Sequence, residues 1–312
     1  MGTVSYLRPE DTVTIQRAID AYISNHLATP SRSPGTRRVF ETTLRLFADH
    51  FGPDTPLHAL DADQVAEWFT ARWGDMSPAT WNRNLSTIRS AIRYWADQGW
   101  AVDEQLTRRL SNQKTPTDRT RALSRAQIER LLSRKDVPLR DKTLWRMLYE
   151  TAARCSEVLA LNVEHLDLRN RCARVRRKGG AVDVIYWQTG TARLLPRLIG
   201  ARKSGPLFLT DRRARVELNA ADLDPETGRA RLSYRRAAEI FEQATNDYEG
   251  GPWTLHQLRH SALTHAAEAG ANTATLMAYS GHSNVASLQR YARVSPEALG
   301  RWQAERDPLR RG

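Results

Sequence analysis

A helix near the C-terminus has residue types at a spacing that suits a bound phosphate. The segment 256–260 reads HQLRH, and the i, i+3 spacing puts His256 and Arg259 on one helical face. The capping pattern of Thr254 and Gln257 predicts that the helix begins at Thr254, so both side chains lie in its first turns. A helix N-terminus favours an anion, because its N–H groups are unpaired and its dipole is positive there.

A metal site is the rival interpretation of this helix. His256 and His260 stand four residues apart, as in the zinc motif H-E-x-x-H, but Gln257 cannot replace the glutamate that acts there as general base. No third ligand is evident, and the two cysteines, Cys155 and Cys172, are too few for a zinc ribbon. We therefore favour phosphate over zinc and expect no metal ion.

Four more residues fit phosphate chemistry, although each also has an ordinary structural explanation. Arg154 lies in a break between two predicted helices, where an arginine is usually a surface charge. Lys178 lies in the turn of a predicted β-hairpin. His282 follows Gly281, and Tyr291 stands nine residues later between two arginines. A phenol has an ordinary pKa of about 10, so a nucleophilic tyrosine needs a base or cations beside it.

The order of these residues resembles the tyrosine recombinases, also called the phage integrase family. That family has an arginine, a hairpin lysine, a His-x-x-Arg pair, a second histidine and, nine residues later, a tyrosine. The matching residues here are Arg154, Lys178, His256, Arg259, His282 and Tyr291. The resemblance extends over essentially the whole chain.

The sequence departs from the family's usual pattern at three places. Ala152-Ala153 stands where the family has Gly-Leu before the first arginine, and Ser280 replaces a more usual leucine before the second histidine. After Lys178 the family often has another basic residue, whereas residues 179–183 read GGAVD here. Lys178 is therefore the one lysine that this hairpin offers.

The resemblance implies covalent exchange of DNA strands. Tyr291 attacks a phosphodiester to form a 3′-phosphotyrosyl intermediate, while the two arginines and His282 stabilise charge on the non-bridging oxygens. Lys178 protonates the leaving 5′-hydroxyl, and His256 assists proton transfer. Because the bond energy stays in the phosphotyrosine, we expect neither ATP nor a metal as cofactor.

The charge distribution agrees with a nucleic-acid partner. The chain has 312 residues, with 47 Lys+Arg, 35 Asp+Glu and a net charge of +12. Residues 1–110 contain 12 basic and 13 acidic residues, whereas 111–312 contain 35 basic and 22 acidic residues. The positive excess therefore lies in the part that holds the candidate site. No apolar run is long enough for a membrane span and no signal peptide is evident, so we expect a cytoplasmic protein.

The elements that position these residues predict an α+β protein of two domains. Residues 1–110 form a four-helix domain, with helices at 11–28, 36–51, 61–73 and 79–98. By resemblance it is a SAM-like core-binding domain. A polar linker, 111–122, leads to a catalytic domain, 123–312, which is mainly helical with a small β-hairpin.

Periodicity and capping patterns also place the elements of the second domain. Helices are predicted from Ser124 and at 138–152, 233–246, 254–269 and 273–279. Strands are predicted at 171–176 and 181–187, with a further short strand at 207–209 and a loop over 212–230.

DNA contact by the first domain is predicted from arginines on two of its helices: Arg37 and Arg38 on one, and Arg83, Arg89 and Arg93 on the other. The alternative is that these arginines only form a solvated helix face. We favour contact with phosphates, because a protein that clamps DNA needs a contact surface on both of its domains. The tryptophans are expected in the core: Trp68, Trp73, Trp81, Trp95 and Trp100.

The resemblance implies double-stranded recombination sites as substrate, held in pairs by a homotetramer. The tail 296–312 is either a segment that docks on a neighbouring protomer or a final helix on its own domain. Two other classes of protein stay open. A type IB topoisomerase-like enzyme is disfavoured by the small first domain, and a non-catalytic DNA-binding accessory protein by the intact catalytic set.

Overall fold

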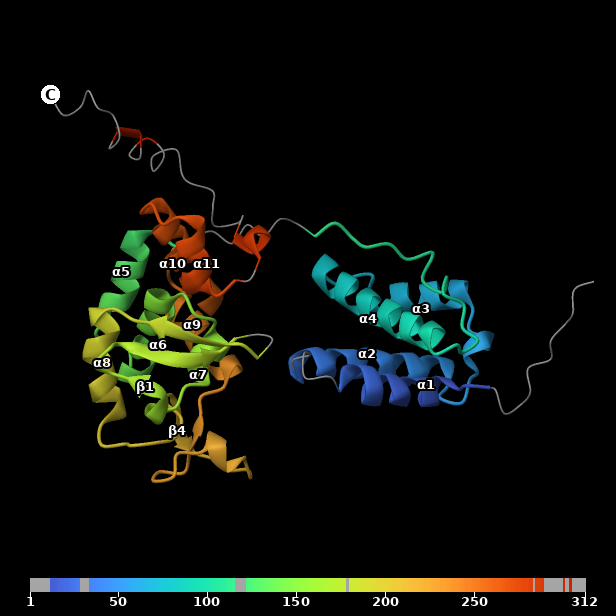
Figure 1. Ribbon diagram of the computed structural model, residues 1–312, viewed down its shortest axis with the longest axis horizontal. Coiled ribbons are helices and arrows are strands. Elements are labelled where there is room, and N and C mark those ends of the chain that lie inside the picture. The colour runs from blue at the N-terminus through green and yellow to red at the C-terminus, as the bar shows by residue number, and fades with distance from the viewer. Residues whose placement is uncertain are drawn as a thin grey trace, which may run out of the picture. The chain divides into compact units, whose positions relative to one another are not determined.

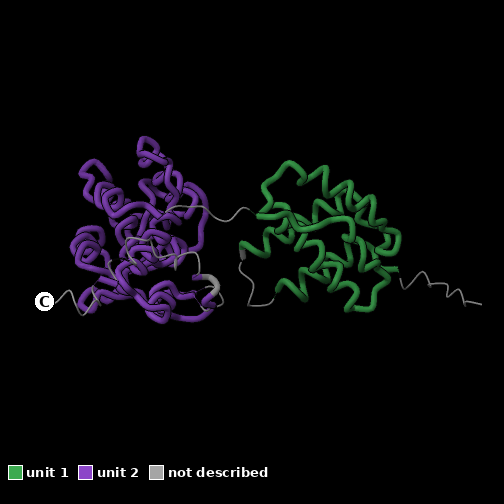
Figure 2. The backbone as a smooth tube through the Cα atoms, turned by 90° about the horizontal axis from the view of Figure 1, so that it is seen from above, with its two compact units in different colours: residues 1–119 green, residues 120–312 purple. Residues whose placement is uncertain are grey.

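The structure is a computed structural model that describes residues 12–28, 34–115, 122–177, 180–282, 284–288, 300 and 303–304. The chain divides into two compact units, residues 1–119 and 120–312, each with its own hydrophobic core (Figure 2). The first unit is helical and the second combines helices with small antiparallel sheets (Figure 1). The predicted α+β class is confirmed. Among the described residues, no helix is long and apolar enough to cross a membrane.

Unit 1 contains four α-helices with two shorter helical segments among its described residues. They are α1 Ile15–Ala21, the π-helix η2 Tyr22–Leu27, α2 Pro34–Phe51, the 3₁₀ turn η3 Leu57–Ala59, α3 Ala62–Trp73 and α4 Pro78–Asp97. Asp61 begins α3 by accepting the N–H groups of Asp63 and Gln64 at 2.9 and 3.1 Å. At the start of α4, Ser77 is the cap and Pro78 takes the first helical position.

Aromatic side chains fill the core of unit 1. Trp68, Trp73, Trp81 and Trp95 are buried, and Trp100 packs half-buried at the edge. Trp95 donates its indole N–H to the carbonyl of Ala18 at 2.9 Å, so this polar group is satisfied inside the core. The prediction that the tryptophans form the core is confirmed.

Unit 2 holds a three-stranded antiparallel sheet in the order β1 Leu166–Asp167, β2 Cys172–Arg176 and β3 Val182–Tyr186. Cys172 pairs with Tyr186 and Arg176 with Val182. Val175 and Ile185 face the core, whereas Arg174 is exposed. This alternation is the period of two that a sheet with one solvated face requires.

Unit 2 contains seven α-helices among its described residues. They are α5 Arg125–Ser133, α6 Leu139–Thr151, α7 Cys155–Leu159, α8 Thr189–Ile199, α9 Tyr234–Thr245, α10 Leu255–Glu268 and α11 Thr273–Ser280, with 3₁₀ turns η4 Val163–His165 and η6 Val285–Leu288. Helix α6 packs against both α8 and α10 (Figure 1). The capping box predicted at Ser124 is formed, with Ser124 and Gln127 bonding each other's backbone N–H groups.

The predictions between 207 and 231 were wrong in detail. The short strand predicted at 207–209 is a longer one, β4 Leu209–Arg213, and the predicted loop contains its partner, β5 Arg229–Arg231, and the 3₁₀ turn η5 Ala220–Asp222. Neither strand has a buried residue, so both lack the alternation of buried apolar and exposed side chains by which a strand is recognised. Helix α8 was not predicted, although its leucines recur at a helical spacing on either side of Pro196.

Candidate active site

The start of α10 carries the predicted His-x-x-Arg pair. Gln257 Oε1 accepts the N–H of Thr254 at 2.7 Å, which fixes the first turn of the helix. Arg259 is 3% exposed, whereas His256, three residues earlier, is exposed. The arginine therefore points into unit 2, and the histidine lies at its surface.

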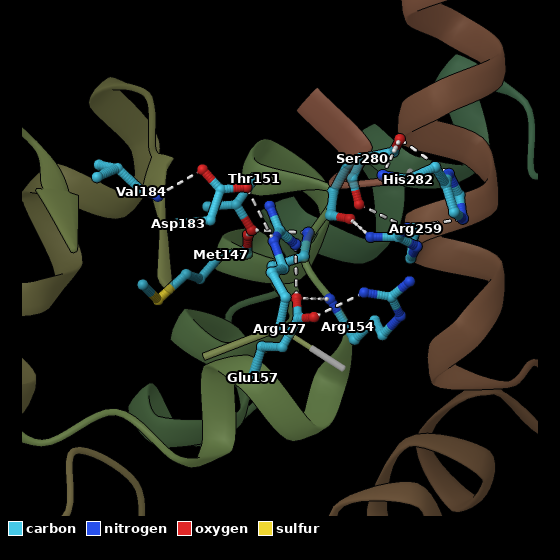
Figure 3. A network of polar contacts seen from close by, with 12 residues as sticks. Met147, Thr151, Arg154, Glu157, Arg177, Asp183, Val184, Arg259, Ser280 and His282 are labelled. Atoms are coloured by element: carbon cyan, nitrogen blue, oxygen red, sulfur yellow. Dashed lines mark hydrogen bonds and ion pairs between the residues drawn. The ribbon is translucent and has the colours of Figure 1, made fainter. Parts of the chain in front are cut away.

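Arg259, near the start of α10, forms hydrogen bonds with the ends of α6 and α11. Its Nη1 donates to the carbonyl of Ala152, at the end of α6. Its Nη2 donates to the carbonyl of Ser280 at 2.8 Å and lies 3.3 Å from Nε2 of His282, just after α11 (Figure 3). Because Ala152 is only two residues before Arg154, these contacts hold the Arg259 guanidinium beside the segment that carries the first arginine.

Ala152 takes a backbone conformation that suits glycine. Its φ of 50° and ψ of 18° are left-handed, and this is where the resembled family has its Gly. An alanine there costs about 1–2 kcal/mol relative to a right-handed residue. The left-handed turn ends α6, and the carbonyl of Ala152 becomes the acceptor for Arg259.

His282 is held by the serine that replaces the family's leucine. Ser280 is fully buried, and its Oγ lies 2.8 Å from Nδ1 of His282. The same Oγ accepts the backbone N–H of His282 at 3.3 Å and donates to the carbonyl of Met277 at 3.3 Å. The hydroxyl of Ser280 therefore holds the imidazole ring of His282 at its Nδ1 edge.

Arg154 is the N-cap residue that precedes α7, and it shares its carboxylate partner with a second arginine. Its Nη1 donates to Glu157 Oε1 at 2.8 Å, and its backbone N–H donates to Oε2 at 2.9 Å. Arg177 Nη1 donates to the same Oε2 at 2.7 Å (Figure 3). The side chains of Glu157 and Arg177 are 4% and 6% exposed, whereas that of Arg154 is 33% exposed.

Arg177 is a member of this network that sequence reasoning missed, since it was assigned only to the hairpin turn. Its Nε donates to Asp183 of β3 at 3.1 Å. Its Nη2 is buried without a hydrogen-bond partner among the residues that the structure describes. A donor left in this condition costs about 1–3 kcal/mol, so the position is not optimised for stability. A pair of opposite charges across a hairpin, Arg177 and Asp183, was the available signal.

Lys178 and Tyr291 lie outside the described residues. The described ends of the hairpin turn are closed by two backbone hydrogen bonds. Arg177 donates to the carbonyl of Ala181 at 2.7 Å, and Gly180 donates to the carbonyl of Arg177 at 3.0 Å. The tail 296–312 is likewise described only at residues 300, 303 and 304.

Buried polar contacts around α6 hold the elements of the site in register. Glu150 accepts the N–H groups of Gln188 and Thr191 at 2.9 and 3.1 Å, at the beginning of α8. Tyr279 of α11 donates to the carbonyl of Glu150 at 3.0 Å, and its burial raises the pKa of its phenol. This tyrosine is therefore a structural donor.

Cys155 follows Arg154 directly and is half-buried. Burial raises the pKa of its thiol to about 12, so it stays protonated at neutral pH and does not compete as a nucleophile. In the described part of the chain, no group of three or more His, Cys, Asp or Glu side chains is arranged to hold a metal ion.

Comparison with known proteins agrees with this arrangement. Residues 121–298 match the phage integrase family, and residues 19–99 match the N-terminal SAM-like domain of phage integrases. The chain belongs to the phage integrase family. Both units are therefore accounted for, because each match lies within one of them.

Named relatives of this phage integrase family member are tyrosine recombinases. The chain is 31% identical to tyrosine recombinase XerD of Caulobacter vibrioides over 86% of this chain and 87% of that protein. It is 27% identical to XerD of Ralstonia nicotianae over 97% and 96% of the two chains, and 28% identical to XerC of Mycobacterium leprae over 86% and 91%.

Solved structures share its fold. The integrase of the Tn1549 transposon, in complex with a circular intermediate DNA, gives a TM-score of 0.67 at 21% identity, over 95% of this chain and 99% of that chain. A lambda integrase dimer bound to a COC′ core site gives 0.68 at 15% identity, over 93% and 82%.

The arginines predicted to contact DNA lie on α2 and α4 of the SAM-like unit. Arg38 and Arg83 are exposed and line one hollow of about 330 Å³. Arg93 is also exposed, and Arg37 pairs with Glu41 at 2.6 Å. Arg89 differs from these four.

The guanidinium of Arg89 is used within unit 1. It donates to the carbonyl of Leu110 at 2.7 Å, and to Thr107 and Asn112 side chains at 3.3 Å each. These contacts hold the segment that follows α4. They give Arg89 a structural role that the sequence did not indicate.

Proposed function

We propose that this protein is a site-specific DNA recombinase that cleaves and rejoins strands through a 3′-phosphotyrosyl intermediate. The observation that carries the proposal is the arrangement of Arg259, which bonds the end of α6 beside Arg154 and contacts His282. Two guanidiniums and an imidazole from separate elements are thereby held around one region, as an oxyanion of a phosphodiester requires.

The proposed reaction needs no cofactor. The phenolic oxygen of Tyr291 attacks phosphorus in line, and the bond from phosphorus to the 5′-oxygen breaks. Lys178 gives a proton to that oxygen, while His256 takes part in removing the phenolic proton. The 5′-hydroxyl of a second strand then attacks the phosphotyrosine, and the tyrosine is released. Arg154, Arg259 and His282 stabilise the negative charge in both steps.

The substrate in this proposal is a pair of double-stranded recombination sites held by a homotetramer, in the cytoplasm. DNA complexes of two structural neighbours support a DNA partner. Arg38 and Arg83, which lie on one surface of unit 1, are the residues of this unit that we propose to contact phosphates. The tail 296–312 is proposed to dock on a neighbouring protomer.

Covalent trapping tests the nucleophile. The target duplex is first selected from a random double-stranded pool, and one strand is then nicked close to the cleavage point so that the cleaved fragment diffuses away. We expect a protein–DNA adduct with the native protein and none with Tyr291→Phe, because the phenylalanine has no oxygen to attack phosphorus. Equal adducts from both proteins would contradict the assignment.

Two further outcomes separate the other classes of protein. Relaxation of a supercoiled plasmid by the monomer, with no recombinant from a plasmid bearing two target sites, indicates a topoisomerase-like enzyme. Specific binding of the duplex without any adduct in the native protein indicates a non-catalytic DNA-binding protein.

A further inference from the structure

The hairpin of unit 2 carries an arginine that touches three parts of the site without being one of the residues that contact phosphate in the proposed reaction. Arg177 bonds Glu157 of α7 at 2.7 Å and Asp183 of β3 at 3.1 Å. Its guanidinium also lies against Gly281, the residue before His282. A Cβ at position 281 would collide with the guanidinium of Arg177. Figure 3 shows Arg177 at the centre of this network.

The guanidinium of Arg177 lies so close to Gly281 that a residue with a side chain would not fit at position 281. Gly281 has a φ of 62°, which ends α11 in the left-handed region. The Arg177 side chain is 6% exposed and is held by two carboxylates, so it cannot swing away as a surface arginine does. The hairpin and the turn that leads to His282 are consequently packed on each other through one guanidinium.

Glu157 links this guanidinium to Arg154. The buried carboxylate accepts from Arg154 Nη1 on one oxygen and from Arg177 Nη1 on the other. If Arg154 were the only cation at Glu157, the pair would be locally neutral. Arg177 adds a second positive charge, so that the three side chains carry a net charge of +1. The charge of Asp183 counts for less, because its side chain is 44% exposed to solvent.

We propose that Arg177 is a positioning residue that shares Glu157 with Arg154, keeps the charge of Arg154 available to the scissile phosphate and fixes β3 against the Gly281-His282 turn. This role rests on the proposed recombinase function.

The test compares cleavage with binding in three single variants. Arg177→Met keeps the length and apolar stem of the side chain but removes its charge and fork. Arg177→Lys keeps the charge but cannot reach two carboxylates as a planar fork does. Arg174→Met is the matched control, because Arg174 is an exposed arginine three residues before Arg177, on β2. Each protein is mixed in excess with the nicked duplex on which the native protein forms its adduct.

We expect the single-turnover rate of adduct formation to fall about 100-fold in Arg177→Met and about 10-fold in Arg177→Lys. The dissociation constant for DNA should stay within about threefold of the native value, since Arg177 is buried away from solvent. Arg174→Met should react at the native rate. A native rate in Arg177→Met overturns the proposal, as does a loss of affinity that explains the whole loss of rate.

A double variant separates positioning from a role in stability alone. In an Arg154→Lys background, adding Arg177→Met should cost less than about threefold in rate, because the two residues act through the same carboxylate. A further 100-fold loss there contradicts the proposal. If Arg177→Met does not fold, Arg177→Lys carries the test, and a native rate in that variant overturns it. Failure of the native protein to form any adduct instead overturns the proposed function.

Discussion

At the scale of single residues, the site depends on how two side chains are oriented. Arg259 is almost fully buried, and its nitrogens face the carbonyls of Ala152 and Ser280. Such a guanidinium is already ordered before a substrate arrives, so little reorganisation accompanies the reaction. His282 has comparable order, because Ser280 bonds one nitrogen and Arg259 lies beside the other.

Ser280→Ala tests the orientation of His282. The substitution removes the hydroxyl that lies 2.8 Å from Nδ1 and leaves the buried volume almost unchanged. We expect the rate of adduct formation to fall about fivefold, the effect of losing one hydrogen bond of about 1 kcal/mol. Single-turnover cleavage of the nicked duplex measures it. Ser133→Ala is the control, since Ser133 is an exposed serine at the end of α5. A native rate in Ser280→Ala contradicts a role in orientation.

At the scale of elements, packing of α6 against α10 brings the first arginine's segment to the His-x-x-Arg helix. Tyr149 of α6 and His265 of α10 form one contact of this interface, with the phenol oxygen 2.8 Å from Nδ1. Burial, with help from the nearby charge of Arg125, lowers the pKa of His265 below its ordinary value of 6.5. The helix pair is therefore built around a neutral imidazole.

This interface should weaken in acid. Below about pH 6.5, His265 is protonated in the unfolded chain but stays neutral in the folded chain, where its pKa is lower. Protonation therefore favours the unfolded chain, and the free energy of unfolding falls as the pH decreases. We expect a lower thermal midpoint at pH 5.5 than at pH 7.5, with a smaller difference in His265→Gln. His58→Gln is the control, because His58 is exposed in unit 1. An equal pH dependence in His265→Gln and the native protein would rule out this linkage.

At the scale of the whole molecule, the two units differ in how they are charged. The first 110 residues have one more acidic than basic residue, whereas the remainder is strongly basic. In the proposed function, net charge does not hold unit 1 on DNA, so its affinity depends on where single arginines lie. The exposed Arg38 and Arg83 are the proposed contacts, whereas the guanidinium of Arg89 is bonded within unit 1.

Arg83→Ala and Arg89→Ala distinguish these roles. The slope of log affinity against log salt is negative. Arg83→Ala should make it less steep by about 1, because one phosphate contact is lost. Arg89→Ala should leave that slope unchanged and lower the free energy of unfolding by about 1–3 kcal/mol, since the carbonyl of Leu110 loses its donor. DNA titrations at several salt concentrations, with thermal unfolding of both variants, measure the two effects. A changed slope in Arg89→Ala alone would reverse the assignment.

Much of the fold and the candidate site was predictable because it follows from local chemistry. The cap at Asp61, the Pro78 start of α4 and the capping box at Ser124 each act within a few residues, so they can be recognised in the chain. The two arginines and the histidines stand at spacings that belong to a known family. The β4–β5 hairpin was missed because neither strand has a buried residue to mark its period of two, whereas α8 was missed despite a clear helical period.

Amino-acid order by itself determined which residues could take part and that a basic domain would hold them. Only the tertiary structure decided how they are held. Ala152, Arg259 and Ser280 are far apart in the chain, yet one guanidinium bonds the carbonyls of the other two. Arg177 and Arg89 became informative in the same way. Hydrogen bonds between distant segments depend on which backbone carbonyls and carboxylates packing brings together, and no local pattern records that choice.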